Sequence, residues 1–108
     1  MDASQRAIHD QLERLRKIAA EALQQRGLAP GSAPDLEKDT VAVGSGEFLV
    51  LLKLIDKTAG SPVKILLMRG TDNPLECLVV DSSDSKLIQT RILAMLAPFL
   101  EKGASEGR

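Results

Sequence analysis

The middle of the chain contains three apolar runs separated by residues that favour turns. They are Phe48 to Ile55, Val63 to Met68 and Leu75 to Val80. Short connections between such runs predict consecutive antiparallel strands, and Thr40 to Val43 is a candidate for a further short edge strand. The Gly44-Ser45-Gly46 sequence lacks the downstream residues of a phosphate loop, so we interpret it as a turn.

These runs are apolar at consecutive positions, which places hydrophobic side chains on both faces of the predicted sheet. A sheet with one solvated face needs apolar residues on its other face only. We therefore expect the second apolar face of this sheet to be covered as well. One run has an alternative interpretation: residues 47–56 are rich in Leu and also contain Lys, both good helix formers, so a helix is a second possibility there.

Two flanking segments have the spacing of helices. The first, residues 4–26, has an apolar stripe at alternating steps of four and three, a possible N-cap at Asp2 or Ser4, and Gly27 at the position of a C-terminal cap. We expect it to pack on the sheet of its own chain or of a second subunit, with an independent coiled coil as the alternative. The second begins near Leu87, and Pro98 predicts a kink or an end.

The pattern as a whole predicts an α+β fold with an N-terminal amphipathic helix, an antiparallel meander of three to four strands, and a C-terminal helix packed on the sheet. The expected boundaries are 1–26 for the first helix and 27–39 for a loop or linker rich in Pro and Gly. The sheet and second helix form the core over 40–102, and a disordered tail occupies 103–108.

Composition narrows the possible functions. Of the 108 residues 44% are hydrophobic but only 2% aromatic, so the surface lacks stacking platforms for bases or sugars. The net charge of −1 gives no general attraction for nucleic acid or anionic lipid. We expect no signal peptide or transmembrane helix, which makes the cytoplasm the default location. The only cysteine, Cys77, lies in an apolar run and is expected to be a buried small hydrophobe.

One short motif has metal-binding potential. Asp81-Ser82-Ser83-Asp84-Ser85 follows a predicted strand and resembles the Asp-x-Ser-x-Ser pattern of the metal-ion-dependent adhesion site in von Willebrand factor A domains. That resemblance would imply Asp81, Ser83 and Ser85 as ligands. In that family, however, the motif closes the first strand of a doubly wound sheet, and here too little chain follows it. Helix capping accounts for the same residues, so no metal and no cofactor are expected.

Catalytic groups are sparse. His9 is the single histidine, and it lies on the first helix without predicted partners. Five carboxylates fall at strand ends and in turns, and nothing pairs two of them for acid–base chemistry. An enzyme is therefore not expected. These carboxylates belong to Glu47, Asp56, Glu76, Asp81 and Asp84.

Two family resemblances rest on the outline of the chain. The order helix, three-stranded meander, helix resembles the YbaB/EbfC family of dimeric nucleoid-associated proteins, which would imply DNA binding. A small, slightly acidic α/β chain with an apolar sheet face is similar in character to the type III secretion chaperones, which hold partner proteins. Basic residues also cluster on the first helix, mixed with acidic ones, as is typical of a solvated surface. They are Arg6, Arg14, Arg16, Lys17 and Arg26.

The favoured interpretation is a non-catalytic, homodimeric adaptor or chaperone-like protein that binds another protein, because a symmetric dimer or a partner would cover the second apolar face. A dimeric DNA-binding protein of the nucleoid-associated type is the alternative. We expect no membrane partner. The candidate interface residues are Ile8, Leu12, Leu15, Leu49, Leu51, Ile55, Leu66 and Met68.

Overall fold

The computed structural model describes residues 2–32, 39–70, 72–80 and 84–106. Helix α1 (Ala3–Gln25) and helix α2 (Ser85–Glu106) flank a sheet in sequence. The strands are β1 (Gly31–Ser32), β2 (Thr40–Ser45), β3 (Phe48–Leu54), β4 (Val63–Arg69) and β5 (Asn73–Val80). Every neighbouring pair is antiparallel and the spatial order is β1-β2-β3-β4-β5. The predicted α+β fold, with an antiparallel meander and a C-terminal helix on the sheet, is confirmed.

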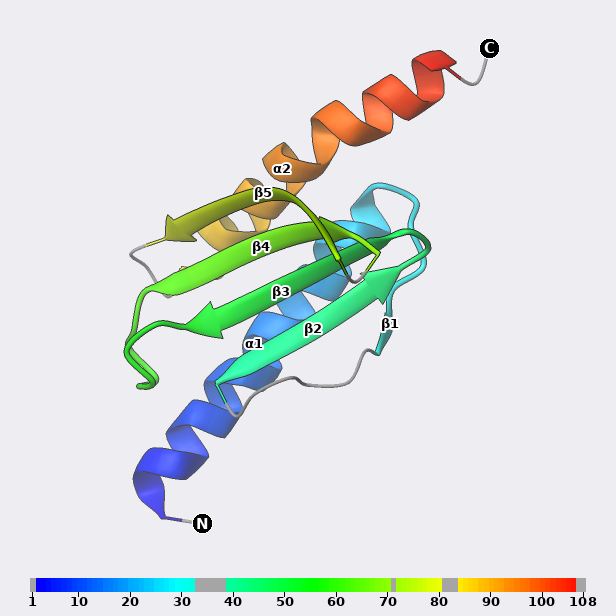
Figure 1. Ribbon diagram of the computed structural model, residues 1–108. Coiled ribbons are helices and arrows are strands. Elements are labelled where there is room, and N and C mark those ends of the chain that lie inside the picture. The colour runs from blue at the N-terminus through cyan, green and yellow to red at the C-terminus, as the bar shows by residue number, and fades with distance from the viewer. Residues whose placement is uncertain (1, 33–38, 71, 81–83, 107–108) are drawn as a thin grey trace.

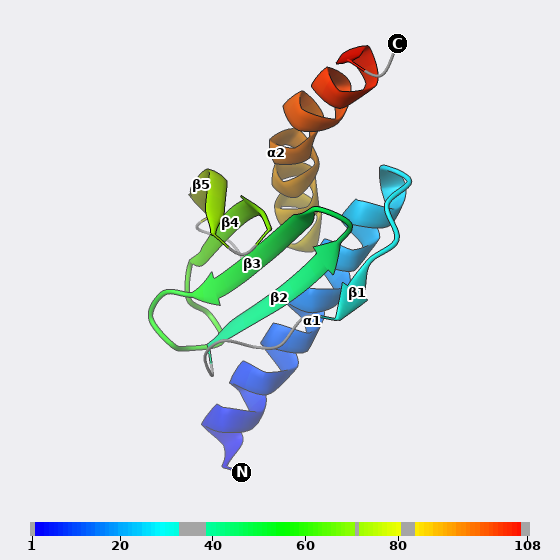
Figure 2. The same cartoon turned by 45° about the vertical axis from the view of Figure 1, so that its right-hand side comes forward.

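Both helices lie on the same side of the sheet. In Figures 1 and 2, α1 runs behind β2 and β3, whereas α2 lies behind the β4 and β5 side. The first helix therefore packs on the sheet of its own chain, which is one of the two arrangements that the sequence predicted. The molecule has two layers, and no described element lies on the other face of the sheet.

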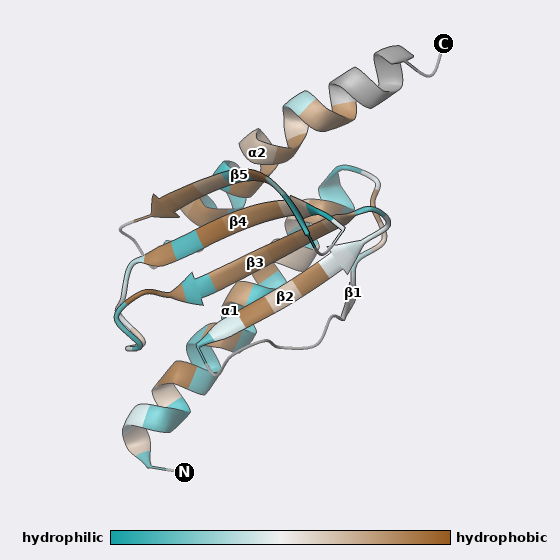
Figure 3. Cartoon of the chain, viewed as in Figure 1, coloured by the Kyte–Doolittle hydropathy of each residue, from teal (hydrophilic) through white to brown (hydrophobic). Residues whose placement is uncertain are grey.

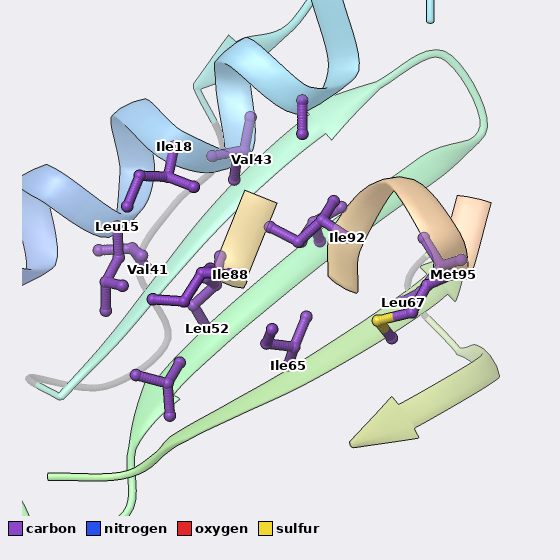
Figure 4. Packing of buried hydrophobic residues seen from close by; sticks show 14 of the residues in the cluster. Leu15, Ile18, Val41, Val43, Leu52, Ile65, Leu67, Ile88, Ile92 and Met95 are labelled. Carbon is purple, nitrogen blue, oxygen red and sulfur yellow. The ribbon is translucent and has the colours of Figure 1, made fainter. Parts of the chain in front are cut away.

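The hydrophobic core fills the space between the helices and the sheet. Its fully buried members include Leu15 from α1, Leu52 from β3, Ile65 from β4 and Ile92 from α2. Figure 4 shows side chains from these elements pointing toward one another. Successive strand residues point to opposite faces, so the core uses alternate residues of β2, β3 and β4. This alternation leaves the intervening residues on the face without helices.

Local sequence signals define the ends of α1. Asp2 accepts a hydrogen bond from the Gln5 backbone N–H at 2.8 Å, and the Gln5 side chain accepts one from the Asp2 N–H at 3.2 Å. This reciprocal pair is a capping box, and it satisfies donors that the first turn leaves open. At the other end Gly27 has a φ of +76°, and the Leu28 N–H donates to the Leu23 carbonyl at 3.0 Å. That is a Schellman termination, for which glycine is the preferred residue.

The structure corrects three expectations about element boundaries. Residues 48–54 form a strand, so the helical alternative for 47–56 is wrong. The segment 27–39 is not entirely a loop, because β1 pairs with β2. Helix α2 continues through Pro98 to Glu106, so it does not end at the proline, and the helix extends into the expected tail. Packing of Met95 and Leu96 on the core holds the helix across the position where a backbone donor is missing.

Candidate protein-binding face

The candidate site is the sheet face opposite the helices, which we call the open face. It carries apolar residues that stand beside one another across neighbouring strands. Leu51 of β3 pairs with Leu66 of β4, which in turn pairs with Cys77 of β5. Leu49 pairs with Met68 in the next outward-facing row. Figure 3 shows hydrophobic positions along most of β3 and β4.

These residues are separate from the hydrophobic core. Ala42 and Leu51 are buried, yet neither belongs to the cluster that joins the helices to the sheet. The half-buried Leu49, Leu66 and Met68 also make no part of that cluster. The open face therefore has its own apolar surface, which no described helix covers.

Exposure of the open face increases toward β5. Leu51 on β3 is 8% exposed, Leu66 and Met68 on β4 are intermediate, and Val79 on β5 is 56% exposed. Cys77 is exposed as well. The most accessible apolar area thus lies over β4 and β5, beside the outer edge of the sheet.

The charge on the open face is positive and lies at one end. Lys53 of β3 and Lys64 of β4 are directly paired across the two strands, and Lys64 is exposed. Like charges at directly opposed positions are unfavourable in a sheet. Among the described strand residues that point to the same face as Leu51 and Leu66, none is acidic.

The sequence-predicted interface residues divide into two groups. Leu49, Leu51, Leu66 and Met68 share the open face, and Ile55 follows the end of β3 with 41% exposure. In contrast, Leu12 and Leu15 are buried in the intramolecular core, and the half-buried Ile8 packs against that core. The stripe on α1 is therefore used within the chain. Sequence reasoning missed Lys64 and Val79, although their alternation with core residues was visible in the strand pattern.

Cys77 is not the buried residue that its apolar surroundings suggested. Its side chain is exposed because alternation along β5 points it to the open face and because β5 is an edge strand. The β5 run by itself gives no sign of which side the helices will cover, because it has apolar residues on both faces. The expectation of burial was therefore wrong.

The Asp81–Ser85 motif is only partly within the described residues. Asp84 accepts backbone hydrogen bonds from Lys86 at 3.0 Å and Leu87 at 3.4 Å, so it caps α2. Ser85 accepts a hydrogen bond from the Arg14 Nε at 2.9 Å, which ties the start of α2 to α1. Asp81 and Ser83 lie outside the described residues. The two described members of the motif thus have structural roles.

The remaining polar candidates lie apart from one another. His9 is exposed on α1, and Glu47 forms an ion pair with Arg69 at 3.2 Å. That guanidinium also lies 5.6 Å from the ring centroid of Phe48 and 5.9 Å from that of Phe99, so the only two aromatic rings flank one cation. Among the described residues, no group of three or more His, Cys, Asp or Glu side chains could hold a metal ion.

Comparisons with known proteins supply no further assignment. The chain matches no protein-family model, and searches of curated proteins and of solved structures find no significant match. Within the described residues, neither helix has the length and apolar character needed to cross a membrane.

Proposed function

We propose that the protein is a non-catalytic adaptor or chaperone-like module that acts as a homodimer and binds another protein through its open face. The observation that supports this proposal is the row Leu51, Leu66 and Cys77, which is apolar, crosses three strands and lies outside the core. Contiguous exposed apolar area in soluble proteins marks an interaction site, and the accessible part of this row lies at Leu66 and Cys77, beside the exposed Val79.

The charges on the face favour a particular kind of partner. An apolar segment followed by acidic residues would cover the leucines and place its carboxylates beside Lys53 and Lys64. A second copy stacked face to face is less favourable, because it would bring the lysines together or bury them against apolar side chains. The occupant is therefore a segment of a different protein with apolar and acidic side chains.

The exposed thiol supports a cytoplasmic location. Cys77 is a free, exposed cysteine without a second cysteine in the chain. Reducing compartments keep such thiols free, whereas secreted domains of this size commonly use paired cysteines.

DNA binding receives less support from the positions of the basic residues. Arg14 donates to Ser85 and to Gln11, and Arg16 pairs with Glu13 at 3.5 Å. These contacts engage two members of the basic cluster on α1 within the chain. A DNA-binding function remains an outcome that the following experiment detects.

The test measures fluorescence anisotropy of a labelled synthetic peptide that has four leucines followed by two glutamates. We expect binding to the protein and at least about tenfold weaker binding, or about 1.4 kcal/mol, for Leu66→Glu. Lys64→Glu should weaken binding of this peptide but strengthen binding of a version ending in two lysines. The matched control is Lys57→Glu, which makes the same charge change in the loop after β3 and should leave binding unchanged.

Two results would overturn the proposal. One is equal binding of the acidic and basic peptides with no effect of Leu66→Glu. The other is absence of peptide binding together with retention of labelled duplex DNA that falls steeply with salt, which would favour the DNA-binding function. Far-UV circular dichroism of each variant establishes that the fold is retained.

A further inference from the structure

The outer edge of β5 is the more open of the two sheet edges. At the opposite edge, β1 pairs with Val43 and Gly44 of β2. The eight residues of β5, by contrast, have no described strand beyond them. A strand edge with unpaired backbone groups is a template for pairing with another strand.

The hydrogen-bond pattern identifies which β5 residues face outward. The Ile55 N–H donates to the Pro62 carbonyl at 3.1 Å, and the Gly70 N–H donates to the Glu47 carbonyl at 2.7 Å. Hydrogen-bonded and non-hydrogen-bonded pairs alternate along antiparallel strands. Carried across the sheet, this alternation directs the backbone groups of Glu76, Leu78 and Val80 toward β4. The backbone N–H and C=O groups of Cys77 and Val79 therefore point to the free edge.

Two exposed charges stand near this edge on the helix side of the sheet. Glu76 has the same parity along β5 as Leu78 and Val80, so it shares their face. An open hollow between β5 and α2 is lined by residues 78–80, Leu87 and Arg91. Neither Glu76 nor Arg91 has an ion-pair partner among the residues that the structure describes.

We propose that two copies of this chain pair through their β5 edges, antiparallel, with Glu76 of each copy beside Arg91 of the other. Among the registers in which a two-fold axis pairs outward-facing backbone groups, two place Cys77 opposite a described residue of β5: Cys77 of the second copy, or Val79 of the second copy. In these registers Glu76 lies opposite Leu78 or Val80 of the second copy. Both of those residues line the hollow that contains Arg91. Two complementary charge pairs result.

Edge pairing has a consequence for the binding face. A two-fold axis perpendicular to the sheet keeps the open faces of both copies on the same side. The exposed part of each face lies over β4 and β5, so the two parts become neighbours and form one continuous surface. This inference rests on the proposed function, which takes the protein to be a homodimer. In the edge-paired dimer the partner-binding site spans both copies.

The test is a charge reversal measured by light scattering with refractive-index detection at micromolar concentration. Wild type should have a mass near twice 11.6 kDa. Glu76→Arg opposes arginine to arginine and Arg91→Glu opposes two glutamates, so each variant alone should be monomeric. A one-to-one mixture of the two variants should recover a dimer, because each interface contact then joins an arginine to a glutamate. Glu21→Arg, an equal reversal on the exposed side of α1, should remain dimeric.

Recovery in the mixture separates the proposed contact from damage within one chain, since a misfolded variant would not regain a partner. A monomeric wild type, single variants that remain dimeric, or a mixture that stays monomeric would each overturn the inference. The open-face variant Leu66→Glu distinguishes the two proposals because it should stay dimeric while losing the acidic peptide. A peptide carrying the binding segment twice should bind wild type at least about tenfold more tightly than Glu76→Arg does.

Discussion

Alanine substitutions of Ile65 and Leu66, made separately, test which face of the sheet contains the core. The two residues are consecutive in β4, so their side chains point to opposite faces. Ile65 is 0% exposed and belongs to the core cluster, whereas Leu66 is half-buried and lies outside it. The substitutions remove similar apolar volume from adjacent positions, which makes each the control for the other.

The expected destabilisation differs because only one substitution leaves an enclosed cavity. Ile65→Ala should lower the free energy of unfolding by about 3 to 4 kcal/mol, within the usual range for a buried aliphatic residue. Leu66→Ala removes only part of the roughly 1.5–3 kcal/mol that full burial contributes, and water can fill the space. Its cost should be about 1 kcal/mol, so we expect a difference of about 2 to 3 kcal/mol.

The assay is urea unfolding followed by far-UV circular dichroism, because the chain contains no Trp or Tyr for fluorescence. The urea concentration at the midpoint of unfolding should shift, while the dependence of the free energy of unfolding on urea concentration stays constant. Measurement at several protein concentrations separates folding from association. Equal costs at concentrations where the protein is monomeric would refute the reasoning, since both faces would then be covered within one chain.

Three further predictions follow from single positions. Gly27→Ala should destabilise the fold by about 1 kcal/mol in urea unfolding because Gly27 has a φ of +76°, whereas Gly60→Ala, with no positive φ and open space around it, should not. Pro98→Ala should restore a backbone donor within α2 and stabilise the fold by up to about 3 kcal/mol, so unchanged thermal stability would contradict a continuous helix. Native Cys77 should react completely with a maleimide reagent in mass spectrometry, whereas protection until denaturant is added would contradict its exposure.

The sequence was sufficient to predict the helices and the four longer strands because each has a local cause. The apolar spacing and Gly27 defined α1, and the turns around Gly46 and Gly70 separated the strands. Gly46 has a φ of +58° in a two-residue hairpin loop, as a turn with glycine at its first central position requires. The end of α2 was less predictable, because tertiary packing outweighs the local effect of Pro98.

The β1 strand and the charges near the free edge could not be predicted from local pattern. A two-residue strand at Gly31–Ser32 has no periodicity of its own and exists through pairing with β2. Glu76 lies in β5 and Arg91 lies in α2, and only the three-dimensional fold brings both to the same margin of the sheet. The functional proposal therefore depends on long-range arrangement more than on any motif.

The choice of which face becomes the core nevertheless has a signal in the sequence. One set of alternate positions in β3 carries no charge, and it consists of Phe48, Val50, Leu52 and Leu54. The intervening positions include Lys53. The same asymmetry recurs in β4, where Lys64 has the parity opposite to Ile65. The observed register brings both lysines to the same face, and burying two ammonium groups beneath helices would carry a large desolvation cost. The helices accordingly cover the side of β3 and β4 that lacks these two lysines, and the apolar residues that share a face with the lysines remain available to a partner with acidic side chains.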